Sequence, residues 1–203
     1  PATAKGLVKR DIIRVVTPGT VMENSMLEEG KNNYLCSVYG TGEQAGICLA
    51  DISTGEARAM EVSGDDLGEA IYNELSRFSP SEVLLAGTLP QSAALEKRCH
   101  EKFHALVEHL PDETDESLCC LRVKNQFHLE DGDLPVRSIC LAAGEMVGYL
   151  QKTQRVGMER LNTLTLFEDA QFMQLDVNTR YNLELCETMR GQEFELTLNL
   201  DQN

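Results

Sequence analysis

One short pattern in the chain could bind a catalytic metal ion. His100-Glu101-Lys102-Phe103-His104 matches the H-E-x-x-H motif, in which two histidines four positions apart on a helix bind zinc and the glutamate activates a bound water. A third ligand would have to come from Glu108, His109 or the carboxylates of the linker that follows. Because the helix is expected to end near His104, the alternative interpretation is a charged helix end that matches the motif by chance.

A second chemistry to consider is phosphodiester cleavage by two metal ions. It requires three or four carboxylates that converge on ions about 4 Å apart. The apolar segments 34–39 and 83–86 contain no carboxylate. Asp51, Glu69 and Glu74 are the nearest candidates, but they do not form a converging set. Asp51 is followed by Ser-Thr-Gly, which favours a turn in which its side chain accepts backbone hydrogen bonds.

Nucleophile and phosphate motifs are also missing. Cys99 and His100 are adjacent, and neighbouring helix residues point apart, so they cannot form a nucleophile–base pair. Cys119 and Cys120 are interpreted as packing and loop residues. Gly40-x-Gly42 lacks the third glycine and following helix of a phosphate-binding turn, and no G-x-x-x-x-G-K-[ST] occurs. The sequence therefore predicts no catalytic, cofactor-binding or metal-binding residue, apart from the weak alternative at His100 and His104.

The charge of the chain disfavours anionic partners. Its 18 basic and 33 acidic residues give a net charge of −15, and the halves before and after Pro111 are both negative. Proteins that hold nucleic acid or an anionic membrane surface gather lysine and arginine, so we expect no DNA-binding residue here. No apolar run reaches the roughly 18 residues that a membrane span needs.

The cysteines indicate a reducing compartment. There are seven, an odd number in irregular spacing and without a C-x-x-C pair, which argues against a structural zinc site. The start, PATAKGLVKR, has no apolar stretch after its charges and so is no signal peptide. It also lacks a methionine, which suggests a piece of a longer protein in the cytoplasm.

Apolar periodicity predicts a mixed α/β arrangement in the first 110 residues. Three strand-like runs separated by glycine turns indicate an antiparallel meander, and a helical period with Leu67, Ile71 and Leu75 on one face follows it. The expected order is a strand at 10–16, a helical or looped segment at 20–30, the meander at 33–39, 45–52 and 56–62, a helix at 65–78, a strand at 83–86, a helix at 91–103 and a strand at 105–110. This order matches a ribonuclease H-like mixed sheet.

The composition changes after an acidic linker at 112–116, DETDE. A long helix is predicted over 134–153, with Ile139, Ala142, Met146 and Leu150 along one face. Extended segments at 161–167 and 171–176 and a helix at 177–189 follow. The second part is thus expected to be a mostly α-helical, incomplete domain.

Five segments in this order resemble the MutS family of DNA mismatch-recognition ATPases. They are Val15–Thr20 (V-x-T-P-G-T), Ala50–Glu56 (D-x-S-T-G-E), Pro80–Leu84 (P-x-E-[LIV]-[LI]), Gly148–Gln154 (Y-[LA]-x-x-T-Q) and Gln174–Glu184 (L-D-x-x-T-x-x-N-L-E). Each is short, but together they cover nearly the whole chain in the family's order.

The resemblance implies that residues 1–115 are a MutS connector domain, ribonuclease H-like, and that residues 116–203 begin the core (lever) domain. A connector of this family carries no catalytic residues; it couples mismatch binding to the ATPase and offers a surface to the partner MutL. Mismatched DNA, ATP and magnesium would be bound by other domains of an intact homodimer, with no membrane attachment. The tail 193–203 departs from the family pattern. A zinc-dependent hydrolase using His100, Glu101 and His104 remains the alternative.

Overall fold

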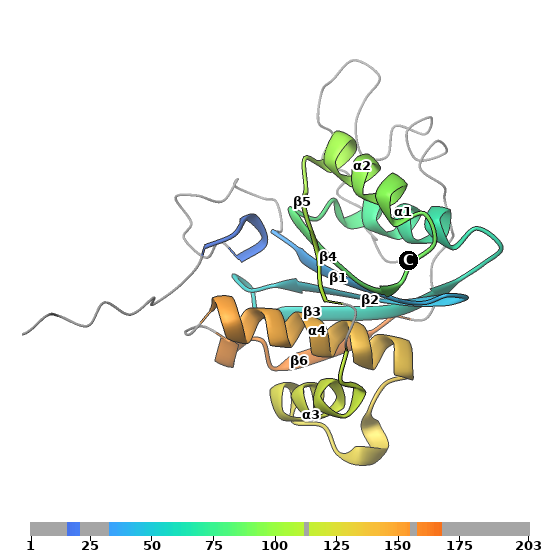
Figure 1. Cartoon of the computed structure of the whole chain (residues 1–203). Coiled ribbons are helices and arrows are strands. Elements are labelled where there is room, and N and C mark those ends of the chain that lie inside the picture. The colour runs from blue at the N-terminus through green and yellow to red at the C-terminus, as the bar shows by residue number, and fades with distance from the viewer. Residues whose placement is uncertain (1–15, 21–32, 112–113, 155–157, 168–203) are drawn as a thin grey trace, which may run out of the picture.

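The computed structural model describes residues 16–20, 33–111, 114–154 and 158–167. These residues form a twisted sheet with helices on both faces (Figure 1). Several predicted segments lie outside the described residues: 20–30 except for Thr20, 171–176, 177–189, the tail 193–203, and all but the last residue of the strand predicted at 10–16.

A six-stranded mixed sheet forms the centre of the structure. Its order is β5-β4-β1-β2-β3-β6. The first three strands pair antiparallel, β4 is parallel to β1, β5 is parallel to β4, and β6 is parallel to β3. The bounds are β1 Leu35–Thr41, β2 Gln44–Asp51, β3 Glu56–Ser63, β4 Glu82–Thr88, β5 Leu106–His109 and β6 Thr163–Leu166. The predicted meander and the ribonuclease H-like mixed sheet are therefore confirmed.

Helices lie on both faces of this sheet (Figure 1). On one face lie α1, Leu67–Phe78, and α2, Ser92–Phe103; on the other lies α4, Arg137–Thr153, with α3, Glu116–Phe127, packed on it. The side chain of Asp66 caps α1 by accepting from Glu69 N–H, and the helix ends before Pro80, as a residue preceding proline favours. Short 3-10 turns occur at η1, Pro18–Thr20, η3, Asp131–Asp133, and η4, Met158–Arg160.

Side chains from alternate positions of the strands fill two separate cores. Cys36, Val38, Ile47 and Leu49 face α1 and α2, whereas Leu35, Cys48 and Ala50 face α4. A strand covered on both faces cannot alternate between polar and apolar residues, which explains the nearly continuous apolar run at 45–52. None of the helices in the described parts of the chain has the length and apolar character of a membrane span.

The close approach of α4 to the sheet depends on Gly46. A Cβ on this residue would lie 2.1 Å from the backbone oxygen of Ser138, so only glycine lets the helix start lie against β2. The apolar face predicted for the long helix is confirmed, because Ile139, Ala142, Met146 and Leu150 are all buried.

The chain beyond residue 115 packs onto the same sheet. Helix α4 contributes Met146, Val147 and Leu150 to a core shared with β1 and β2, and β6 extends the sheet beside β3. Among the described residues, the boundary expected after 115 therefore does not separate two packing units. The acidic linker resembled a domain boundary, but the apolar face of α4 needs burial, and the open face of the sheet provides it. Cys119 and Cys120, interpreted as packing and loop residues, lie within α3 and not in a loop, and Cys119 is buried there.

Candidate functional site

The zinc-binding pattern is not assembled into a metal site. Helix α2 ends at Phe103, and His104 follows with a left-handed backbone, φ 55° and ψ 26°. Its Cβ therefore leaves the helical row on which His100 lies. The candidate ligand His109 contacts Glu96 instead, with Nε2 3.0 Å from Oε2. No group of three histidine, cysteine, aspartate or glutamate residues in the described ranges could hold a metal ion, so the structure lends no support to the zinc hydrolase.

The carboxylates considered for two-metal chemistry have structural partners. Asp51 is 2% exposed; its Oδ1 accepts from the Ser53 amide at 2.9 Å and the Thr54 amide at 3.3 Å. Its turn role is therefore confirmed. Glu69 bonds to Arg98 at 2.7 Å. Glu74 bonds to Arg77 at 2.6 Å, and no common centre is formed.

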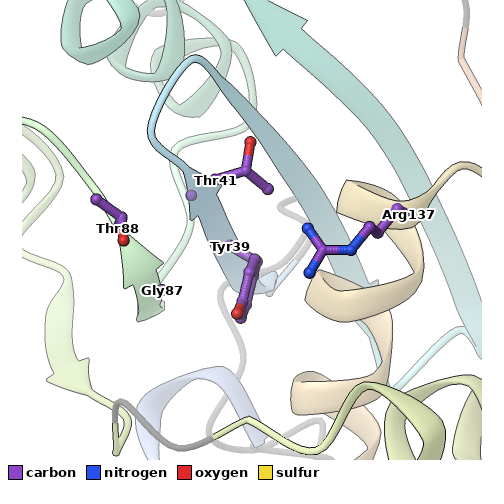
Figure 2. A pocket seen from close by; sticks show the side chains of 6 residues that line it. Tyr39, Thr41, Gly87, Thr88 and Arg137 are labelled. Carbon is purple, nitrogen blue, oxygen red and sulfur yellow. The ribbon is translucent and has the colours of Figure 1, made fainter.

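A polar pocket lies where β1 and β4 end side by side. Its volume is about 290 Å³, and its lining is Tyr39, Gly40, Thr41, Gly87, Thr88 and Arg137. Figure 2 shows the Arg137 guanidinium extending from the start of α4 toward Tyr39 and Thr41. Ligands of open α/β sheets bind at such carboxyl ends of parallel strands. No carboxylate lines this pocket, so its composition suits an anion rather than a pair of metal ions. Arg137 already pairs with Glu116, Nη2 to Oε2 at 2.9 Å.

A buried glutamate lies at the opposite end of the same two strands. Glu82, the first residue of β4, is 0% exposed. Its Oε2 accepts from the Gly19 amide at 2.9 Å, and its Oε1 accepts from the Tyr149 hydroxyl at 2.5 Å. Burial, and after it the hydrogen bond to Glu82, raises the pKa of the Tyr149 phenol well above its usual value. One carboxylate thus joins η1, the sheet and α4.

The Gly19 position cannot hold a larger residue without movement. A Cβ there would lie 2.8 Å from the Cβ of Glu82 and 3.0 Å from the Cα of Leu35. The missing side chain is what allows the backbone of η1 to approach the carboxylate, and this close approach, rather than an unusual φ, explains the glycine.

Asn33 adds three hydrogen bonds to this network. Its Nδ2 donates to the Pro18 carbonyl at 2.6 Å, and its Oδ1 accepts from the Ser81 hydroxyl at 2.6 Å. Its amide donates to Oδ2 of Asp51 at 3.3 Å. We call Gly19, Asn33, Asp51, Glu82 and Tyr149, with the hydrogen bonds between them and their neighbours, the Glu82 network. It links η1 to the sheet and to α4.

Comparison with known protein families identifies residues 33–166 as MutS domain II. The match covers more than half of the chain. The chain belongs to the MutS domain II family.

Curated relatives of this MutS domain II carry the name DNA mismatch repair protein MutS. The one from Acetivibrio thermocellus is 36% identical over 196 residues, which is 94% of this chain and 22% of the relative. The one from Halothermothrix orenii is 34% identical over 202 residues, 98% of this chain and again 22% of the relative. The chain thus spans about a fifth of the length of these relatives.

The family segments meet in the Glu82 network. The T-P-G-T segment supplies Gly19, the D-x-S-T-G-E turn supplies Asp51, the P-x-E segment supplies Glu82, and the helix signature supplies Tyr149. The fifth segment, 174–184, lies outside the described residues. The search for catalytic groups missed Glu82 and Tyr149, although a glutamate that opens an apolar strand after Pro-Ser is a readable signal of a buried, partnered carboxylate.

Proposed function

We propose that this MutS domain II acts as a non-catalytic connector in DNA mismatch repair. It would transmit mismatch binding at one end of the intact protein to an ATPase at the other. The Glu82 network is the observation that carries this proposal. One buried carboxylate holds both η1, through Gly19, and the second half of α4, through Tyr149. If either η1 or α4 moved away from Glu82, its hydrogen bond to this carboxylate would break.

The remaining activities would belong to other parts of the intact protein. We propose that mismatched DNA, ATP and magnesium are bound outside this chain, that the intact protein is a cytoplasmic homodimer, and that this domain offers a surface to MutL. The relatives' name and the strongly negative charge of −15 support this division, since a chain that neutralises no phosphates has no need of basic clusters.

Coupling is tested in the full-length protein with Glu82→Gln. The readout is the change in steady-state ATP hydrolysis when mismatched duplex replaces paired duplex. We expect the substitution to weaken this response while ATP hydrolysis without DNA continues. Glu69→Gln is the matched control, because Glu69 is a half-exposed glutamate whose partner is Arg98. An unchanged mismatch response in a folded Glu82→Gln protein would refute coupling through this network.

The division of labour is tested with the 203-residue chain alone. We expect it to bind MutL saturably and to show equal, weak affinity for mismatched and paired duplex, with no ATP hydrolysis. Mismatch-selective binding by the chain itself would overturn the connector assignment. Failure to bind MutL would refute the proposed partner surface, whereas the coupling role is tested separately by the Glu82→Gln experiment.

A further inference from the structure

Two cysteines on neighbouring helices lie almost within bonding distance. Six free cysteines occur among the described residues. The Sγ atoms of Cys120, on α3, and Cys140, on α4, are 3.1 Å apart. A disulfide bond measures about 2.0 Å, so these sulfurs need to approach by only about 1 Å.

Close packing of the two helices holds this pair in place. A Cβ on Gly144 of α4 would lie 2.4 Å from the Cβ of Cys119, so the helices meet at a point where only glycine fits. Val123 and Phe127 of α3 are buried in the same core as Met146 of α4. The proximity of the two sulfurs therefore follows from the close packing of α3 on α4.

The pair combines one accessible and one protected thiol. Cys140 is 2% exposed, whereas Cys120 is half-buried and open to a small oxidant. The other described cysteines, Cys36, Cys48, Cys99 and Cys119, are all 0% exposed. Oxidation of the described part of the chain should accordingly begin at Cys120.

We propose that Cys120 and Cys140 are a reversible oxidation site that a peroxide converts to a disulfide. The Cys120 sulfur attacks one oxygen of hydrogen peroxide, the O–O bond breaks, and a sulfenic acid and water result. The Cys140 sulfur then attacks the Cys120 sulfur, the S–O bond breaks, and hydroxide leaves with the Cys140 proton as a second water. Two thiols are oxidised, and one peroxide is reduced to two waters.

The environment of Cys140 suits the second reaction step, in which its sulfur attacks the sulfenic acid of Cys120. Burial, followed by the hydrogen bond with Cys120, raises the pKa of the Cys140 thiol to about 12. A thiol that stays protonated near neutral pH is a poor first nucleophile toward peroxide, because the thiolate is the reactive form. It can still resolve a sulfenic acid that forms beside it. Disulfides of reducing compartments are usually of this transient, sensing kind.

The crosslink would make one rigid unit of α3 and α4. It closes the loop from residue 120 to residue 140, which contains η3 and the start of α4. Closing such a loop restricts the unfolded chain. We therefore expect the oxidised chain to unfold at a higher urea concentration than the reduced chain. This inference is independent of the connector function proposed above.

The test is peroxide treatment of the 203-residue chain, followed by intact mass measurement and peptide mapping without reductant. The expected product has lost two hydrogens, carries a Cys120–Cys140 crosslink and returns to the starting mass with a thiol reductant. Cys140→Ser should abolish the crosslink and leave a sulfenic acid at Cys120 that dimedone traps. Cys99→Ser is the matched control, because it removes a buried thiol away from the pair and should leave the crosslink unchanged.

Three results would overturn the proposal: a crosslink that joins other cysteines, a disulfide between two chains, or oxidation of Cys120 beyond the sulfenic acid without a crosslink. If Cys140→Ser does not fold, Cys120→Ser serves the same purpose, since its side chain is half-buried. That variant should show no intramolecular crosslink, and a persisting one would equally refute the assignment.

Discussion

Replacing Tyr149 with phenylalanine removes a single hydroxyl from the Glu82 network. This hydroxyl donates a hydrogen bond of 2.5 Å to Oε1 of Glu82, whose side chain is 0% exposed. Both oxygens of Glu82 accept hydrogen bonds, which is the arrangement of an ionised carboxylate. Hydrogen bonds to charged groups contribute about 1.5–3 kcal/mol, and a buried acceptor without its donor keeps its desolvation penalty. Because the Gly19 amide remains on Oε2, we expect Tyr149→Phe to lower the free energy of unfolding by about 2–3 kcal/mol.

The assay is urea unfolding of the 203-residue chain, followed by circular dichroism. Tyr39→Phe is the matched control, since the half-buried Tyr39 makes no hydrogen bond through its hydroxyl within the described part of the chain. We expect that control to change stability by no more than about 0.5 kcal/mol. A double-mutant cycle with Glu82→Gln then isolates the pair, and contacting residues should give a coupling of about 0.5–3 kcal/mol.

Alkaline pH gives a second, independent readout of the same hydroxyl. The pKa of the Tyr149 phenol is raised in the folded chain, first by burial and then by Glu82. A raised folded pKa means that the neutral form is favoured by folding, so its contribution is complete below the unfolded pKa of about 10 and is lost as pH rises toward the folded value. The stability difference between wild type and Tyr149→Phe should therefore be constant near neutral pH and shrink above about pH 10.

The reasoning fails if Tyr149→Phe costs no more than Tyr39→Phe, or if the coupling with Glu82→Gln is zero. Either result would mean that the carboxylate is satisfied without the phenol. A stability difference that stays constant well above pH 10 would separately contradict the direction of the pKa shift.

Three further substitutions or measurements probe the same interpretation. Gly19→Ala should destabilise the chain by about 1–3 kcal/mol in urea unfolding, because its Cβ would press on Glu82 at 2.8 Å and overpacking carries that cost. Asp51→Ala should lower the free energy of unfolding by about 1–3 kcal/mol, because the Asn33 and Ser53 amides lose their acceptor. Asp51→Asn keeps one side-chain oxygen and should lose less. Zinc analysis of the folded chain should find less than one equivalent, and His100→Ala should change neither that content nor stability.

The sheet and most of its helices could be predicted from apolar periodicity. The meander, α1 and α4 have regular apolar patterns, and the buried faces of α1 and α4 match the expected ones. Helix α2 was predicted at 91–103 without an assigned buried face. Helix α3 could not be placed, because its buried residues Cys119, Val123 and Phe127 are few and two cysteines side by side suggest a loop. The packing of α4 could not be predicted either, because a sequence shows that this helix has an apolar face but does not show which sheet face covers it.

The candidate site was harder to predict, because its members are distant in sequence. Glu82 and Tyr149 are 67 positions apart, and neither carries a motif with a known chemical mechanism. Two of the carboxylates that resembled catalytic groups have partners close in sequence: Asp51 accepts from the amide of Ser53 in its own turn, and Glu74 pairs with Arg77 three residues away. A search for chemistry favours residues close in sequence, whereas a network that joins elements depends on the tertiary fold.

The position of Glu82 bears on the proposed coupling as well as on stability. A buried carboxylate is costly to desolvate, and an apolar residue of similar volume often stabilises a fold as well. An apolar contact, however, tolerates a small slide of α4 along the sheet, since burial has no direction. The hydrogen bonds of Glu82 do not tolerate such a slide, because Oε2 accepts from the Gly19 amide and Oε1 accepts from the Tyr149 hydroxyl. Movement of α4 by even a fraction of a turn must therefore break a charged hydrogen bond or pull η1 with it. The connector role proposed above would require a directional link of this kind.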